Sequence, residues 1–196
     1  MEHSNSDFEI IQTVLAGDIQ LFEDLVKRYQ GKVLRLCYSM VGASASEDAA
    51  QEVFIRVYKS LHQFKGESSF STWIYRVTSN HCLNLLSKKK RERTESLEAL
   101  TEKSREKMSL LPQDQSPLKH LENQQAVHLI LSRMSPEERA ILSLREMEGL
   151  NYKELSETLD ISMELVKVRL FRARKSFIEI AKKILVTSPH QKLSIS

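Results

Sequence analysis

One stretch near the end of the chain constrains the fold more than any other, because its helix boundaries are marked residue by residue. It starts at Met134 and reads MSPEERAILSLREMEGLNYKELSETLDISMELVKVRLFRARKSFIEIAKKIL. Ser135 is a favourable N-cap, Pro136 suits the first helical position, and Glu138 follows the cap by three residues. We therefore expect a helix that starts here and stops at Gly149.

Two more helices follow in the same stretch. Asn151 can cap a short helix, with Glu154 as the second member of a capping box. Asp160 and Ile161 then make a tight turn, and Ser162 can cap a long final helix. Helices joined by a short turn, with a basic helix last, are typical of a helix-turn-helix.

The final helix has two chemically different faces. At about 100° per residue, an apolar face contains Val166, Leu170, Ala173 and Phe177. The opposite side carries Glu164, Lys167, Val168, Phe171, Arg172 and Lys175, with Arg169 and Arg174 at its edges. Residues 162–185 hold seven Lys or Arg and two Glu. Such a face suits the major groove of DNA, although a packed helix with a solvated charged face is the simpler alternative.

The composition places the chain among ordinary folded proteins. Of its 196 residues, 41% are hydrophobic and 28% are charged, and the net charge of +3 decides little about partners. No segment reads as a signal peptide or a membrane anchor, so we expect a cytoplasmic protein without membrane insertion. Cys37 and Cys82 are expected to be buried free thiols, with neither a metal site nor a disulfide.

The pattern predicts an all-α fold with two helical domains joined by a flexible linker. The expected boundaries are 1–91 for the front domain, 92–120 for the linker, 121–186 for the rear domain and 187–196 for a disordered tail. In the front domain we expect helix caps at Asp7 and Asp18, an interruption at Gly31, and a long helix from Phe70 to about Lys90.

Two segments together resemble a known family. They are AQEVFIRVYKSLHQFKGESSFSTWIYRVTSNHCLNLL, which starts at Ala50, and LSRMSPEERAILSLREMEGLNYKELSETLDISMELVKVRLFRARKSF, which starts at Leu131. The chain resembles an extracytoplasmic-function (ECF, group 4) sigma factor of the sigma-70 family over residues 8–90 and 121–180. A helix-turn-helix alone is shared by many regulators, but its combination with the aromatic loop and helix is specific.

The resemblance implies a role in transcription initiation. The front domain would be sigma region 2, which docks on core RNA polymerase and melts the promoter −10 element. The rear domain would be sigma region 4, a DNA-binding helix-turn-helix that binds the −35 element and the polymerase flap. The family commonly responds to envelope or environmental stress, under the control of an anti-sigma factor.

The resemblance also assigns candidate site residues. The family's −35 contacts map onto Lys167, Val168, Phe171 and Arg172, while Arg169 and Lys175 suit phosphates. The candidate −10 residues are Lys65, Gly66, Ser68, Ser69, Trp73, Arg76 and Asn80. The candidate polymerase-binding residues, which include an aromatic expected to be exposed, are Asp48, Gln51, Glu52 and Phe54.

Simpler interpretations remain open for several of these residues. Trp73 and its neighbour Phe70 suit ordinary core packing, and Asn80 suits an ordinary exposed position. The polar face around Asp48 is also typical of an ordinary solvent-exposed helix surface that binds no partner. Val168 is apolar where many members of the family carry a small hydroxyl residue, which leaves the base preference open although a thymine methyl would fit.

Other functional classes are tested against the same residues. The sequence has no phosphate-binding glycine loop, metal-ligand cluster or nucleophile motif, so we expect no catalysis and no cofactor. One alternative is a helix-turn-helix regulator with a helical sensor domain, which would bind duplex operators without polymerase. Another is a protein-binding adaptor, which would neither bind operators nor direct transcripts.

Overall fold

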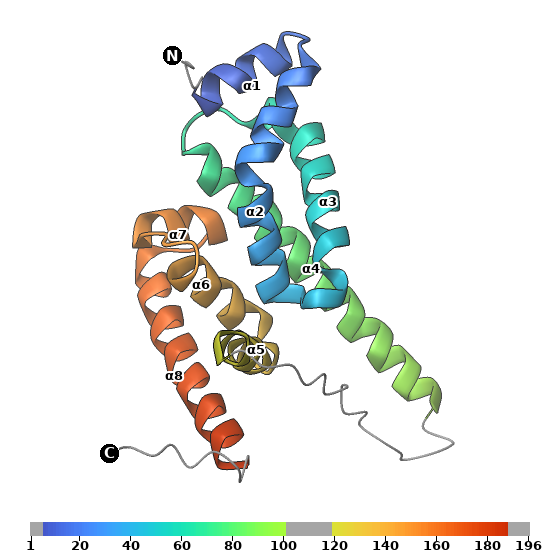
Figure 1. Cartoon of the computed structure of the whole chain (residues 1–196), viewed down its shortest axis with the longest axis vertical. Coiled ribbons are helices and arrows are strands. Elements are labelled where there is room, and N and C mark those ends of the chain that lie inside the picture. The colour runs from blue at the N-terminus through green and yellow to red at the C-terminus, as the bar shows by residue number, and fades with distance from the viewer. Residues whose placement is uncertain (1–5, 101–118, 188–196) are drawn as a thin grey trace.

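A computed structural model describes residues 6–100 and 119–187 of the chain (Figure 1). Within these ranges the regular structure consists of eight α-helices and two short 3-10 helices, and neither range contains a strand. The prediction of an all-α fold is confirmed.

The front domain is a bundle of three long helices with a short helix across one end (Figure 1). The α-helices are α1 (Asp7–Leu15), α2 (Phe22–Val41), α3 (Ala43–Ser60) and α4 (Phe70–Leu100). The 3-10 helices η1 (Ile19–Leu21) and η2 (Leu61–Gln63) lie in the connections. The helices bury apolar stripes at helical spacing, among them Leu25, Val33, Val53, Val57 and Ile74.

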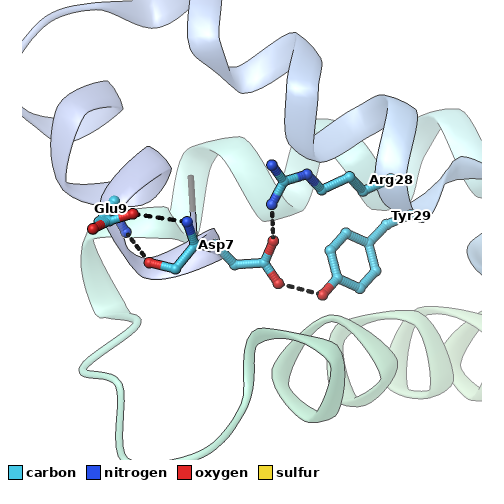
Figure 2. A network of polar contacts seen from close by, with 5 residues as sticks. Asp7, Glu9, Arg28 and Tyr29 are labelled. Carbon is cyan, nitrogen blue, oxygen red and sulfur yellow. Dashed lines mark hydrogen bonds and ion pairs between the residues drawn. The ribbon is translucent and has the colours of Figure 1, made fainter. Parts of the chain in front are cut away.

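The cap of α1 lies one residue earlier than expected. Ser6 and Glu9 form the capping box, in which the Glu9 amide donates to Ser6 Oγ at 3.3 Å and the Ser6 amide donates to Glu9 Oε2 at 2.8 Å. Asp7 is therefore free to accept hydrogen bonds from Arg28 and Tyr29 (Figure 2). The expected capping role of Asp7 is replaced by a polar contact that fastens α1 to α2.

Two other expectations for the front domain are wrong. Gly31 does not interrupt the chain, because α2 continues through it from Phe22 to Val41. A helical glycine costs about 1 kcal/mol, which the buried side chains on both sides, such as Tyr29 and Val33, outweigh. Asp18 precedes η1 and makes no capping hydrogen bond through its side chain.

The rear domain follows the expected helix-turn-helix pattern. Its helices are α5 (Lys119–Ser132), α6 (Pro136–Glu146), α7 (Tyr152–Leu159) and α8 (Met163–Thr187). Ser135 Oγ accepts from the amide of Glu138 at 3.2 Å, and Ser162 Oγ accepts from that of Leu165 at 3.2 Å. The capping box of α7 is also present, and its residues are Asn151 and Glu154. These predictions are confirmed.

The turns of the rear domain use positive φ angles. Gly149 has φ +74°, and α6 ends at Glu146, slightly before the expected position. Asp160 takes φ +54° at the turn between α7 and α8, a conformation that aspartate tolerates better than most residues. The turn sets the angle at which α8 leaves the motif.

The expected linker is partly helical. Helix α4 continues through residues 92–100, past the expected end near Lys90. This part of the chain has neither glycine nor proline, and Lys88 lies 3.8 Å from Glu92 in an (i, i+4) pair, so nothing in it stops the helix. Of the rest of the expected linker, residues 101–118 lie outside the described residues, and residues 119–120 already belong to α5. The expected tail, residues 187–196, begins with the last residue of α8, and its residues 188–196 lie outside the described residues.

The two domains pack against each other. Helices α5 and α6 lie against α2, and α7 lies beside α4 (Figure 1). Arg139 of α6 is buried in this contact and donates to the carbonyl oxygen of Met40 in α2. It also donates to the carbonyl oxygens of Ser132 and Met134 at 3.0 and 3.2 Å. Its burial lowers the pKa of the guanidinium from the ordinary value.

Candidate nucleic-acid interface

Helix α8 presents the candidate −35 face to solvent. Its apolar side is in the core, where Val166 and Ala173 have no exposed surface and Leu170 is 1% exposed. On the opposite side Phe171 is 70% exposed, an unusual value for a phenylalanine. The other outward residues are Glu164, Lys167, Val168, Arg172 and Lys175. The predicted orientation of the two faces is confirmed, whereas their contact with DNA stays a prediction.

The two cations at the edge of this face lie near carboxylates of α6. Arg174 lies 2.7 Å from Glu146 of α6, and this hydrogen bond raises the pKa of Arg174. Arg169 is half-buried and shares a cleft with Arg172 and with Glu137 at the start of α6. These contacts orient the edge of α8 and leave Lys167 and Arg172 exposed at its centre.

The candidate −10 residues lie on one loop and on the first turns of α4. Lys65, Gly66 and Ser69 are exposed, and Ser68 is half-buried. Ser69 Oγ accepts from the amide of Thr72 at 3.1 Å and therefore caps α4. The structure thus gives Ser69 a local structural role besides the expected one.

Gly66 also has a structural role. Its φ angle is +76°, and a Cβ atom at this position would lie 3.0 Å from the Phe8 ring of α1. The loop therefore packs closely against the N-terminal helix at this position.

Only one of the two aromatic residues beside the loop reaches the surface. Phe70 is 3% exposed and packs edge-to-face on Tyr29, with 5.2 Å between ring centroids, so it is a core residue. Trp73 is half-buried and stacks on Phe70 at 5.7 Å. Arg76 and Asn80 are exposed on the same side of α4 as Trp73. The surface consequently has one aromatic, one cation and one amide close together.

The candidate polymerase face on α3 differs from expectation in one residue. Asp48 and Gln51 are exposed, and Glu52 is half-buried with its carboxylate 3.0 Å from Arg56. Phe54 is not an exposed aromatic, because it is half-buried and packs against the core. Tyr58, one turn further along, is 44% exposed and is the aromatic that this face presents.

The structure also shows a groove that the sequence pattern did not reveal. It has a volume of about 360 Å³ and lies between α5, α6 and α8 of the rear domain. Its walls are mostly apolar and include Val127, Leu131, Met147, Phe177 and Ile178. Ile178 is 52% exposed. The helical spacing of the sequence had placed it on neither of the two faces of α8.

Cys37 and Cys82 lie together in the front-domain core as free thiols, as expected. Their sulfur atoms are 3.8 Å apart, and the hydrogen bond to Cys37, together with burial, raises the pKa of Cys82. Within residues 6–100 and 119–187 no group of three or more His, Cys, Asp or Glu is arranged to hold a metal ion. Over the same ranges, no helix is both long and apolar enough to cross a membrane.

Comparison with known proteins identifies similar sequences in both domains. The family profile described as "Sigma-70 region 2" matches residues 25–92, and "Sigma-70, region 4" matches residues 124–177. The RNA polymerase sigma-H factor of Pseudomonas aeruginosa is 33% identical over 175 residues, or 87% of this chain and 91% of that protein. The ECF RNA polymerase sigma-E factor of Escherichia coli K12 is 31% identical over 180 residues, or 90% and 94%.

Solved structures show the same fold at lower identity. CnrH, solved in complex with the cytosolic domain of CnrY, has a TM-score of 0.63 and 18% identity, and the match covers 91% of this chain and 99% of CnrH. The sigma factor RpoE of Bartonella quintana, solved with the anti-sigma factor NepR, has a TM-score of 0.61 and 17% identity, with 82% and 96% covered.

Proposed function

The chain belongs to the ECF sigma factors of the sigma-70 family, and from this premise we propose which of its surfaces performs each part of initiation. A sigma factor is the DNA-binding initiation subunit of RNA polymerase and has no catalytic activity of its own. The chain therefore directs transcription rather than acting as a free-standing repressor or an adaptor. The assignment of individual residues is the proposal.

We assign recognition of the −35 element to the exposed face of α8. The observation that carries this assignment is the exposed set of Lys167, Phe171 and Arg172 on a helix fixed by a capped helix-turn-helix. Arg172 is long enough to reach a base edge, whereas Arg169 and Lys175 suit phosphates. Val168 is 44% exposed and suits contact with a thymine methyl group.

We assign capture of the melted −10 strand to the front domain. Lys65 and Arg76 supply positive charge, Trp73 supplies a stacking surface, and Asn80 supplies donor and acceptor groups. Gly66, Ser68 and Ser69 form the rim of the loop. Because Phe70 is buried in the core, stacking on a base falls to Trp73 alone among these two aromatic residues.

We further propose that the chain acts in the cytoplasm, where an anti-sigma factor holds it until an envelope or environmental stress releases it. Family membership supports this proposal, and the relative from Bartonella quintana was solved with such a partner. Isolation of the native protein from unstressed cells as an unbound, active sigma factor would contradict it.

Run-off transcription tests the proposed function directly. Purified chain is combined with core RNA polymerase and a library of genomic fragments, and the transcript starts are mapped. We expect a small set of starts that share upstream elements and that depend on the added chain. Transcripts that are the same with and without the chain would contradict a role in initiation.

The variant carrying Asp48→Ala and Glu52→Ala should bind core polymerase about tenfold more weakly. Loss of charged contacts at the centre of an interface typically costs about 1–2 kcal/mol. The affinity is measured by titration of labelled core polymerase, and circular dichroism verifies the helical content.

A matched control for this pair is the double variant Glu23→Ala and Glu179→Ala. It removes the same charge and breaks two exposed (i, i+4) ion pairs, Glu23 with Lys27 at 2.8 Å and Glu179 with Lys175 at 3.9 Å, where the test variant breaks one. We expect it to bind polymerase like the wild type. If both double variants bound core polymerase with equal affinity, the face around Asp48 would not be part of the polymerase interface.

A further inference from the structure

The loop that carries the candidate −10 residues is closed at its base by aromatic side chains. Phe64 immediately precedes the loop and Phe70 immediately follows it, and both are buried with their ring centroids 5.5 Å apart. Trp73 packs on both rings, at 5.6 Å from Phe64 and 5.7 Å from Phe70. Because packed aromatic rings have preferred geometries, the contacts of this cluster also set the position of the loop and of Trp73.

Helix α1 is connected to this cluster through Tyr29 of α2. The Tyr29 ring packs edge-to-face on Phe70 at 5.2 Å, and its hydroxyl donates to the carboxylate of Asp7 at the start of α1 (Figure 2). Arg28 donates to the other oxygen of the same carboxylate at 2.9 Å. Hydrogen bonds to a charged acceptor are stronger than those between neutral groups. Asp7 is thus linked to Trp73 through two aromatic rings, although the two residues lie far apart in the sequence.

Phe8, the next residue of α1, contacts the loop itself. Its Cε2 atom lies 3.0 Å from the position that a Cβ atom of residue 66 would take, so only glycine leaves room for the ring. Phe8 is 50% exposed, whereas the side chains that anchor α1 in the core are those of Ile10, Ile11 and Val14. The position of Phe8 is therefore accounted for by the loop and not by the core.

We propose that Asp7 and Phe8 are positioning residues, through which α1 sets the shape of the loop and the placement of Trp73 for capture of the melted −10 strand. Phe8 acts through Gly66, and Asp7 acts through Tyr29. Neither residue needs to touch the DNA. This inference rests on the proposed function for the role of the loop, but not for the coupling of α1 to Trp73.

Such positioning affects discrimination between bases more than general attraction to DNA. Hydrogen bonds weaken steeply when their geometry is poor, and a binding group must be held within about 0.5 Å of its productive position. The attraction between Lys65 or Arg76 and phosphates extends over about 8 Å at physiological salt, so it tolerates a displaced loop. A misplaced loop should therefore weaken binding of the correct strand and leave binding of other strands nearly unchanged.

The first measurement needs no DNA, because Trp73 is the sole tryptophan of the chain and its fluorescence reports its surroundings. In the free full-length chain, Phe8→Ala and Asp7→Ala should each shift the emission to longer wavelength and increase quenching by acrylamide. Phe8→Tyr keeps the ring and should resemble the wild type. Leu15→Ala is one matched control, at a 45% exposed position two turns further along α1. Asp18→Ala is the other, since it removes the same charge from a side chain that makes no cap hydrogen bond.

Holoenzyme reconstituted from each variant and core RNA polymerase supplies the second measurement. One probe is a fork-junction DNA with a duplex −35 element and a single-stranded non-template −10 strand, taken from a promoter mapped by run-off transcription. The other probe carries base substitutions in the −10 strand. Phe8→Ala should lower the preference for the correct strand about tenfold, within the usual range of coupling between residues in contact. Its affinities for the substituted probe and for core polymerase should stay at the wild-type values.

Gly66→Ala tests the same contact from the side of the loop. The added methyl group would meet the Phe8 ring, and the φ angle of +76° also disfavours alanine. Gly42→Ala carries a similar backbone penalty at φ +84° with nothing within 4 Å, so it is the matched control. We expect only Gly66→Ala to lose discrimination between the two probes. The double variant Phe8→Ala and Gly66→Ala should lose less than the sum of the two single variants.

The outcomes separate this inference from the proposed function. Unchanged Trp73 fluorescence in both Phe8→Ala and Asp7→Ala, with helical content intact, would overturn the coupling whatever the DNA binding shows. Altered fluorescence with wild-type discrimination would overturn the positioning role, as would an equal loss of affinity for both probes. A wild-type holoenzyme that did not distinguish the probes would contradict the proposed −10 role itself, which the fluorescence of the free chain does not measure. Altered fluorescence together with lowered discrimination that Phe8→Tyr restores supports the inference.

Discussion

The variant Arg172→Glu should bind duplex DNA containing the −35 element roughly thirtyfold more weakly, the equivalent of about 2 kcal/mol. Arg172 lies at the centre of the exposed face of α8, so its reversal removes one favourable contact and places a carboxylate against the DNA. Promoter-specific run-off transcription should fall in parallel. The affinity for core polymerase, measured by titration, should stay at the wild-type value.

Lys182→Glu provides a control with the same change of charge on the same helix. Lys182 is exposed but lies more than two turns beyond Arg172, outside the proposed −35 face. We expect at most a small, salt-dependent loss of DNA binding in this variant. A similar loss in both variants would indicate general electrostatic attraction rather than recognition, and a parallel loss of polymerase binding for Arg172→Glu would contradict the division of roles.

Leu155→Ala should destabilise the rear domain by about 2–5 kcal/mol, the usual cost of a large cavity in a core. Leu155 is fully buried in α7, where it supports the helix that positions α8. The midpoint of thermal unfolding of this domain should fall by about 8 °C or more. In a thermal melt of the full chain followed by circular dichroism, the rear domain should then unfold in a separate transition at lower temperature.

Leu165→Ala makes the same chemical change at a surface position. Leu165 is 37% exposed near the start of α8, so we expect a change within about 0.5 kcal/mol. If Leu155→Ala and Leu165→Ala melted alike, the packing of α7 between α4 and α8 would not be as described. Leu155→Ala should lose binding to the −35 element only at temperatures above its lowered unfolding midpoint. That result would show that Leu155 affects DNA binding through its support of α8.

Local signals in the sequence were enough to predict the all-α fold and the helix-turn-helix. A cap such as Ser135, Asn151 or Ser162 bonds to an amide three residues away, so its role depends on neighbours that the sequence displays directly. The orientation of α8 was predictable for the same reason, because helical spacing alone separates Val166 from Arg172. The family resemblance then supplied the function.

Errors occurred where a local preference met contacts from a distant part of the chain. Gly31 should weaken a helix, yet side chains of other helices hold α2 together around it. Phe54 was expected at the surface, but the core of the bundle partly covers it. Asp7 can cap a helix, but Ser6 performs that role while Asp7 contacts Arg28 of α2.

Residue types, spacing and caps therefore determined where the helices lie and which face of α8 meets solvent. The tertiary structure alone decided that Arg139 is buried at Met40 and that Glu148 is enclosed by Tyr75 and Arg35. In the sequence both are ordinary charged residues of the segment that follows Ser135. Their partners lie far away along the chain, and burial of a charge depends on which surfaces come together, which no local pattern encodes.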